Sequence, residues 1–231
     1  MSSSSFVFIL ILPSIYSREI QIHNNCPFTT WVGITGPGNP ENGEFRLENN
    51  ESRNVEVEDS WSAGRIWART LCDENMKCVT GSCASLEKCS GSRPEPPVTV
   101  VEFTLKGASD LDYYDVSLVD GYNIPITIEA IGGTGDNCRK AGVCKEDLNA
   151  ICPEKFAVKY EENTVACKSS CLVFNNDQEC CRNSFANPEK CSQTQTSSLF
   201  KNACPGAFAY DFDDASTTFT CVGANYIVQF C

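Results

Sequence analysis

The chain has 231 residues, with 18 lysines and arginines against 30 aspartates and glutamates, so its formal net charge is −12. This charge argues against partners that are held by lysine and arginine, such as the phosphates of nucleic acids or anionic lipid headgroups. We therefore expect no nucleic-acid partner and no binding to anionic membranes. The length allows one full-sized domain with smaller appended modules.

Residues 1–17 are predicted to be a secretory signal peptide. An unbroken apolar run from Phe6 to Leu12 ends at Pro13, and the small residue Ser17 precedes Arg18, as is typical of signal cleavage sites. The run is too short to cross a membrane, which takes about 20 apolar residues. Because basic residues are missing from its start, an apolar N-terminal strand is the alternative. Cleavage after Ser17 would give a secreted, extracellular protein.

Sixteen cysteines follow this segment, and this even number predicts eight disulfides in an oxidising compartment. The alternative is zinc, but structural zinc sites usually contain C-x₂-C pairs, often with histidine. The sequence has no C-x₂-C pair, and His23 is its one histidine. We therefore expect neither a metal nor a cofactor, and a structural or surface role for His23.

Short strands are predicted along most of the chain. Apolar and polar residues alternate with period two most clearly over 54–58 and 124–130, which is the pattern of a strand with one solvated face. The predicted strands are 20–23, 54–58, 98–105, 124–130 and 225–230. Many short strands separated by Gly, Pro and Asn turns indicate an all-β sandwich or flattened barrel.

One β-hairpin is predicted from a turn signal. Asp120-Gly121 separates an apolar run at 116–119 from the strand pattern at 122–128, and Asp-Gly is a favoured hairpin turn.

The cysteine-dense segment 138–204 differs from the strand regions. It holds nine cysteines and few alternating runs, so disulfides are expected to order its loops. One short helix is predicted there, with Ser197 or Ser198 as its N-cap and with Pro205 just after its end. Four further cysteines in 72–89 predict a small stapled excursion from the sandwich.

Several motifs occur in a fixed order along the chain. They are GRIWART (64–70) followed by Cys72, CVTGSC (78–83), YDVSLVDGYNIP (114–125), the pair Cys180-Cys181, and Cys204-Pro205 leading to TFTC (218–221). In this order and with this cysteine count, the sequence resembles the thaumatin-like proteins of the pathogenesis-related, osmotin type. The resemblance covers essentially the whole mature chain.

The resemblance implies a fold and a disulfide pattern. The fold is an all-β, flattened sandwich (18–71, 90–137 and 205–231) with a small disulfide-stapled hairpin module (72–89), a disulfide-rich loop module with a short helix (138–204), and a cleft between them. The implied disulfides are Cys26–Cys231, Cys72–Cys78, Cys83–Cys89, Cys138–Cys221, Cys144–Cys204, Cys152–Cys167, Cys171–Cys180 and Cys181–Cys191.

The stapled module departs from the family pattern. Ser82 stands where aspartate is usual, Ala84-Ser85 stands where Gly-Gly is usual, and only five residues separate Cys72 from Cys78. We expect the module beside the cleft to be shorter than in typical family members, and we expect this difference to affect which ligands the cleft accepts.

The resemblance also implies an acidic cleft. By motif, its residues are Arg65, Glu102, Asp115, Asp120 and Asp213, with Asp211 and Asp214 as alternatives in the last segment. Strand periodicity independently allows Glu102 and Asp115 to face a groove while their chain neighbours face the core.

Clustered carboxylates can carry out acid–base chemistry. Because like charges repel, one carboxyl group keeps its proton while another is ionised, which is what glycoside hydrolysis requires. We expect Glu102 as the general acid, Asp115 or secondarily Asp120 as the base or nucleophile, and Arg65 as the partner of an ionised carboxylate. The alternatives are solvated surface carboxylates, an Asp120 bonded to the amides of its own turn, and a structural ion pair of Arg65.

The functional hypothesis is a monomeric, antifungal defence protein that binds β-1,3-glucan, with weak endo-β-1,3-glucanase activity left open. Tyr113, Tyr114 and Tyr122 are candidate stacking surfaces for sugar rings. The alternative is an inhibitor of a hydrolase, or another protein-binding module, that acts through its stapled loops. Membrane permeabilisation has family precedent, but the charge disfavours it.

A modification site is predicted separately. Asn50-Glu51-Ser52 is an N-glycosylation sequon in a polar segment, which places a candidate glycan on Asn50 in a eukaryotic secretory pathway.

Overall fold

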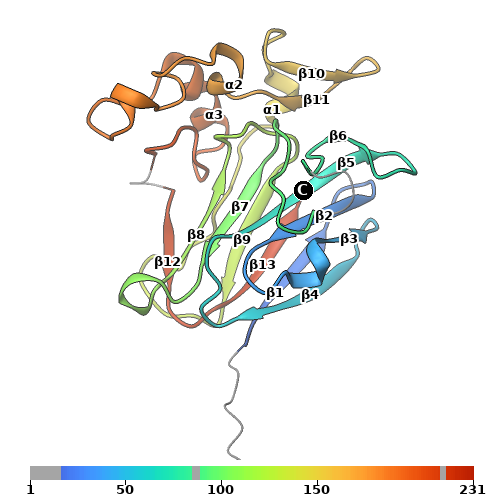
Figure 1. The fold of residues 1–231 in the computed structure, drawn as a ribbon, viewed down its shortest axis with the longest axis vertical. Coiled ribbons are helices and arrows are strands. Elements are labelled where there is room, and N and C mark those ends of the chain that lie inside the picture. Colours follow the sequence, from blue (N-terminus) through green and yellow to red (C-terminus); the bar gives the residue numbers. More distant parts are fainter. Residues whose placement is uncertain (1–16, 85–88, 214–216) are drawn as a thin grey trace, which may run out of the picture.

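Two β-sheets enclose the core of the structure, a computed structural model that describes residues 17–84, 89–213 and 217–231 (Figure 1). The smaller sheet has the strand order β4 (Ser52–Glu58), β1 (Ser17–Asn24), β13 (Asn225–Phe230) and β9 (Ile126–Ile131). The larger sheet has the order β12 (Phe219–Cys221), β8 (Asp112–Ser117), β7 (Val100–Thr104), β5 (Gly64–Cys72), β2 (Thr30–Thr35) and β3 (Glu44–Leu47), with β6 (Cys78–Thr80) paired to β5.

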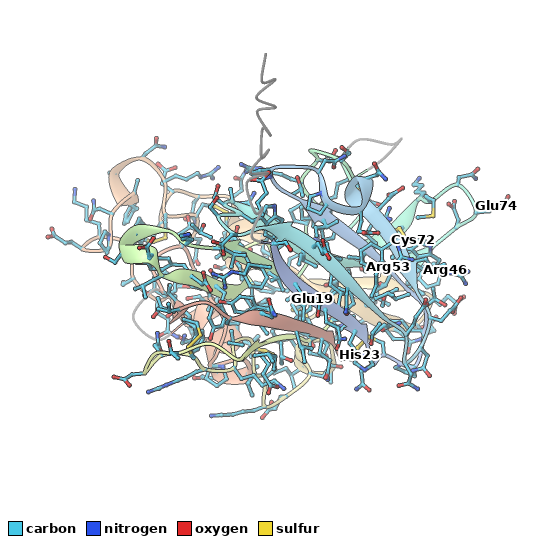
Figure 2. All side chains as sticks on the ribbon, turned by 90° about the horizontal axis from the view of Figure 1, so that it is seen from below. Glu19, His23, Arg46, Arg53, Cys72 and Glu74 are labelled. Carbon is cyan, nitrogen blue, oxygen red and sulfur yellow. A yellow bond between two sulfur atoms is a disulfide. The ribbon has the colours of Figure 1, made fainter. Side chains whose placement is uncertain are left out.

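Alternating side chains explain why these strands form two layers. In β1, Ile20 and Ile22 are fully buried. On the other face of the strand, Glu19 is exposed and His23 is half-buried (Figure 2). The apolar faces of both sheets meet in one cluster that includes Phe103 and Tyr226, whose rings lie 5.0 Å apart. The predicted all-β fold is therefore confirmed, since burying one face of each sheet requires a second layer.

The cysteine-dense segment contains the shorter elements. They are α1 (Leu148–Ile151), α2 (Ser170–Phe174), α3 (Gln195–Ala203), the two-stranded sheet of β10 (Ala157–Tyr160) and β11 (Asn163–Cys167), and the 3₁₀ turn η3 (Asn183–Phe185). Two further 3₁₀ turns, η1 (Pro40–Gly43) and η2 (Ala108–Asp110), lie in loops of the sandwich. None of the helices among the described residues is long and apolar enough to span a membrane.

Helix α3 begins earlier than the sequence predicted. Thr194, not Ser197 or Ser198, is its N-cap, and a capping box forms in which the side chain of Ser197 accepts a hydrogen bond from the Thr194 backbone N–H. Ser197 is thus the third residue of the helix. A serine that serves the cap from this position resembles an N-cap in the sequence, which explains the error.

Eight disulfides crosslink the chain, and no described cysteine is free. They join the same pairs that the resemblance implies: Cys26–Cys231, Cys72–Cys78, Cys83–Cys89, Cys138–Cys221, Cys144–Cys204, Cys152–Cys167, Cys171–Cys180 and Cys181–Cys191. The first bridge ties the turn after β1 to Cys231. The predicted signal peptide lies outside the described residues except for Ser17, which begins β1.

The stapled segment packs on the outer face of the larger sheet. Trp67 of β5 is fully buried and donates a hydrogen bond from Nε1 to the carbonyl of Gly81 at 2.9 Å. Gly33 on the neighbouring strand makes room, because a Cβ atom there would lie 2.1 Å from the Trp67 ring. A second small core results, formed by Trp67, Cys83, Cys89, Val98 and Val100.

The predicted hairpin at Asp120-Gly121 is wrong. The turn exists, with the Gly121 N–H bonded to the Leu118 carbonyl at 2.9 Å, but β8 and β9 belong to different sheets. After the turn, Tyr122 pairs with Cys167 through two backbone hydrogen bonds instead of pairing back with β8. The turn signal is therefore real, but it marks a crossover between the layers.

Candidate functional site

Three charged side chains form a row across neighbouring strands of the larger sheet. Arg65 on β5 pairs in register with Glu102 on β7, and Glu102 pairs with Asp115 on β8. The chain neighbours of the two carboxylates, Val101, Phe103, Tyr114 and Val116, are buried in the core. The period-two prediction for Glu102 and Asp115 is thus confirmed, and both lie on the face of the sheet that points away from the core.

This row lines an open cleft of about 570 Å³. The described residues that line it are Arg65, Arg93, Val100, Glu102, Asp115, Ser117, Val119, Asp120, Phe208, Asp211 and Thr218. They come from β5, β7 and β8, from the turn after β8, from the segment after the stapled loop, and from the loop between α3 and β12. The cleft therefore brings together four carboxylates and two guanidinium groups from distant parts of the sequence.

Arg65 and Glu102 form an ion pair inside this cleft. The Arg65 Nε donates to Glu102 Oε1 at 2.6 Å, and both side chains are about one-third exposed, at 33% and 37%. An ion pair this exposed is screened by solvent and contributes little to stability. Its structural effect is to hold the carboxylate in one position on the cleft floor.

Asp120 and Asp211 are exposed residues of the cleft, and each carboxyl group lies near other charges of the cleft. Burial raises the pKa of Asp120, and the nearby Glu102 raises it further, while Arg65 and Arg93 lower it. Burial also raises the pKa of Asp211, and the charges of Asp120 and Glu102 add to this shift. These two carboxyl groups are therefore the ones in the cleft most inclined to carry a proton.

Asp120→Asn is expected to raise the melting temperature at pH 7 and to change it little near pH 3. Because folding raises the pKa of Asp120, the stability linked to its proton is present below the ordinary pKa of about 4. That stability is lost as the pH rises through the folded-state value. Calorimetric melting at both pH values tests this, with the exposed Asp136→Asn as control. A lower melting temperature at pH 7 would contradict the raised pKa of Asp120.

The assignment of Asp213 to the cleft is wrong. Its Oδ2 accepts hydrogen bonds from Lys201 Nζ at 2.9 Å and from the Ala209 N–H at 3.1 Å, so the side chain is bound to α3 and its own loop. Asp211 lines the cleft instead. The third alternative, Asp214, lies outside the described residues. The segment is irregular, so no periodicity in the sequence distinguishes these aspartates.

Two of the three proposed stacking tyrosines are buried. Tyr114 is 1% exposed and Tyr122 is 0% exposed, and their hydroxyls bond to the Arg139 carbonyl and to Asp147 respectively. Neither ring is available to a sugar. Tyr113 alternates with the buried Tyr114 and lines a smaller pocket of about 220 Å³ that shares Glu102 and Asp115 with the cleft.

Arg93 is a cleft residue that the sequence analysis missed. It follows the stapled loop in an irregular segment, and its backbone carbonyl accepts a hydrogen bond from the Ala84 N–H at 3.2 Å. No strand pattern surrounds it. Only the folding of this segment onto the larger sheet brings its charge to Asp120.

The sequon residue Asn50 is exposed in the turn between β3 and β4. Its backbone N–H bonds to the Asn24 carbonyl at 2.7 Å, so the turn is fixed while the side chain remains on the surface. N-glycosylation at Asn50 stays a prediction.

Comparison with protein families identifies the family of this chain. The family model described as "Thaumatin family" matches residues 24–231, and the chain therefore belongs to the thaumatin family. It is 46% identical over 240 residues to "Pathogenesis-related protein 5" of Arabidopsis thaliana, covering 100% of this chain and 98% of that protein. It is 44% identical over 215 residues to "Pathogenesis-related thaumatin-like protein 3.5" of Cryptomeria japonica, covering 90% and 87%.

A solved structure with a similar fold is a laminaripentaose-producing β-1,3-glucanase in complex with laminaritetraose. The TM-score is 0.59 with 8% sequence identity, and the match covers 92% of this chain and 98% of the glucanase. At this identity the likeness concerns the fold alone.

Proposed function

We propose that this protein is a secreted plant-type defence protein that binds a β-1,3-glucan chain in the acidic cleft. Membership of the thaumatin family and relatives named as pathogenesis-related proteins support the defence role. Eight disulfides fit an oxidising, extracellular compartment. An antifungal action follows if the bound polymer belongs to a fungal cell wall.

The row of Arg65, Glu102 and Asp115 is the observation that carries this proposal. A neutral sugar chain presents many hydroxyl donors, and carboxylate oxygens are acceptors without donors of their own. Arginine provides the complementary donors for ring and hydroxyl oxygens. Because the row runs across three strands, its spacing is fixed by the sheet, and the site is organised before the ligand arrives. The fold shared with the laminaritetraose-bound glucanase motivates β-1,3-glucan as the first ligand to test.

Hydrolysis in this cleft would use a different general acid from the one that the sequence suggested. Glu102 accepts a hydrogen bond from Arg65, whereas a general acid must donate a proton to the leaving oxygen. The carboxyl groups with raised pKa are Asp120 and Asp211. We therefore assign the acid role in any hydrolysis to one of these two, and a binding role to Glu102 and Asp115.

Binding is tested by co-sedimentation with insoluble β-1,3-glucan. The double variant Glu102→Gln/Asp115→Asn keeps the side-chain shapes, and we expect it to lose at least about tenfold in retention, since each charged acceptor contributes about 1.5–3 kcal/mol. Retention unchanged in this variant would contradict the proposed site. Exchange of the stapled residues 72–89 leaves Arg93 of the cleft in place. If this exchange abolished the defence activity while the double variant kept it, the protein would act through its stapled loops, as an inhibitor does.

A further inference from the structure

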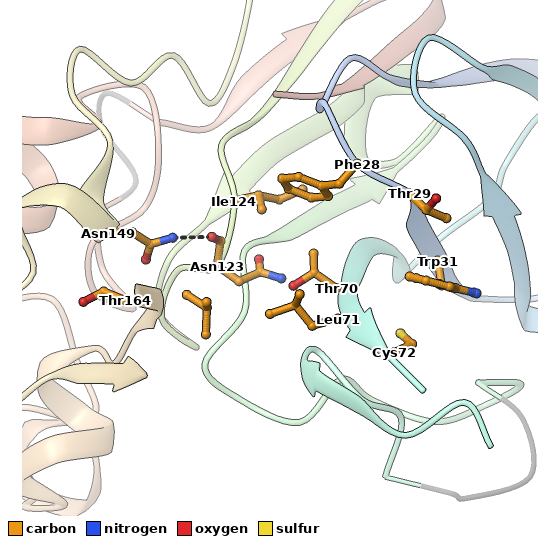
Figure 3. A pocket seen from close by; sticks show the side chains of 11 residues that line it. Phe28, Thr29, Trp31, Thr70, Leu71, Cys72, Asn123, Ile124, Asn149 and Thr164 are labelled. Carbon is orange, nitrogen blue, oxygen red and sulfur yellow. Dashed lines mark hydrogen bonds between the residues drawn. The ribbon is translucent and has the colours of Figure 1, made fainter. Parts of the chain in front are cut away.

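We propose that a second, apolar pocket of this protein binds a neutral ring-containing small molecule. The residues that line this pocket are drawn in Figure 3. Its volume is about 480 Å³, and it shares none of its described lining residues with the acidic cleft. It lies between one end of the larger sheet and Asn149, Thr164 and Val165 of the cysteine-dense segment. Its size is that of a site for a drug-sized ligand.

The walls of the pocket are apolar and uncharged. Phe28 and Trp31 supply aromatic rings, and Leu71, Ile124 and Val165 supply aliphatic surface. Phe28 is 44% exposed and Leu71 is 43% exposed, which is high for side chains whose burial is favourable. No Lys, Arg, Asp or Glu is among the described residues that line the pocket. Two charged groups contact lining residues, Arg46 over the Trp31 ring and Glu48 at the Thr29 hydroxyl, and they are paired with each other. The pocket therefore presents no unpaired charge to a charged ligand, and we infer a neutral occupant.

Most polar groups on the walls are already bonded within the protein. Asn123 donates to the Ala68 carbonyl at 2.8 Å and to Thr80 at 2.9 Å, and it accepts from the Thr99 N–H. Thr70 is bonded to Thr80 at 2.8 Å. Such groups have little hydrogen-bonding capacity left for a polyhydroxylated ligand. A sugar chain therefore fits the acidic cleft better than this pocket, and apolar burial must supply the affinity here.

Crosslinks on both sides hold the pocket open. Cys72 lines one wall and is bonded to Cys78, while Cys152–Cys167 clamps β11 on the other side. Asn149 Nδ2 donates to the Asn123 carbonyl at 2.7 Å, which ties the two walls together (Figure 3). Because the crosslinks keep the walls rigid, the pocket is already formed before a ligand binds, and binding does not have to order it.

N-Phenyl-1-naphthylamine, an uncharged aromatic probe whose fluorescence rises in apolar surroundings, tests the proposal on the full, oxidised chain. We expect saturable one-to-one binding. Leu71→Glu places a charge on the pocket wall and should raise the Kd at least about tenfold, since a charge is costly to bury. Leu172→Glu is the matched control, because Leu172 on α2 is similarly exposed, at 37%, and lies outside the pocket. Its Kd should stay within about twofold of the unmodified protein.

A second measurement follows the tryptophan side chains. The chain has three tryptophans, and Trp61 and Trp67 are fully buried in the two cores. In ¹H–¹⁵N spectra, the probe should shift the indole N–H signal of Trp31 and leave the other two in place, with Trp31→Phe assigning the signal. Non-saturable binding, equal weakening by both leucine variants, or an unmoved Trp31 signal would overturn the proposal.

Discussion

Asp112→Ala is expected to lower the free energy of unfolding by about 3–5 kcal/mol, the cost of removing one partner from a buried ion pair. Asp112 is 0% exposed and receives hydrogen bonds from the Tyr226 hydroxyl at 2.9 Å, the Lys106 N–H at 2.9 Å and Arg18 at 3.2 Å. Burial raises the pKa of the Tyr226 hydroxyl, so the phenol keeps its proton and donates it to this carboxylate.

The loss is large because three donors lose their acceptor together. The Arg18 guanidinium also binds Asp59 and the Ala224 carbonyl, so it stays in place with part of its charge uncompensated. Urea denaturation monitored by tryptophan fluorescence measures the change. The exposed Asp136→Ala should stay within about 0.5 kcal/mol of the unmodified protein. If both variants were equally stable, Asp112 would not anchor Arg18 of β1 to the larger sheet.

Removing the Cys26–Cys231 disulfide should cost about 5 kcal/mol in the chain-entropy description, one of the largest expected changes in this protein. The bridge joins residues 205 apart in sequence. The same description gives about 2.6 kcal/mol for Cys171–Cys180, which closes a loop of 9 residues. Cys138–Cys221 shortens the long loop in the unfolded chain, but the logarithmic dependence on length makes this correction small.

Paired double alanine variants compare the two bridges directly. Denaturation of the variant lacking Cys26 and Cys231 should give the lower midpoint, and the variant lacking Cys171 and Cys180 should lie between it and the unmodified protein. Equal losses in the two variants would show that the length of the closed loop does not determine the stabilisation.

Properties that depend on neighbouring residues could be predicted from the sequence. The alternation around Glu102 and Asp115 assigns each side chain to one face of a strand, and it holds in the structure because the pleat has a period of two. β13 (Asn225–Phe230) has the predicted bounds for the same reason. The disulfide pairs and the presence of Arg65 in the cleft required the family resemblance, because local pattern does not say which distant segments meet.

The incorrect predictions from the sequence concern features that are determined by tertiary contacts. Asp120-Gly121 forms its turn, but Tyr122 then finds its backbone partner in Cys167, so the expected hairpin becomes a crossover. Asp211 and Asp213 are indistinguishable in sequence, and only the contact with Lys201 removes Asp213 from the cleft. The apolar pocket was missed because its walls come from segments that are far apart in the sequence, such as 28–31 and 164–165. No local pattern shows that these segments meet.

The most direct test of the proposed function is titration calorimetry with a soluble β-1,3-glucan oligosaccharide. Glu19→Gln/Glu56→Gln is the matched control for Glu102→Gln/Asp115→Asn, because Glu19 and Glu56 are also paired across neighbouring strands but lie exposed on the smaller sheet. Both variants remove two negative charges. The proposed site predicts that the control binds like the unmodified protein while the cleft variant loses at least about tenfold in affinity. Equal affinity in all three proteins would contradict it.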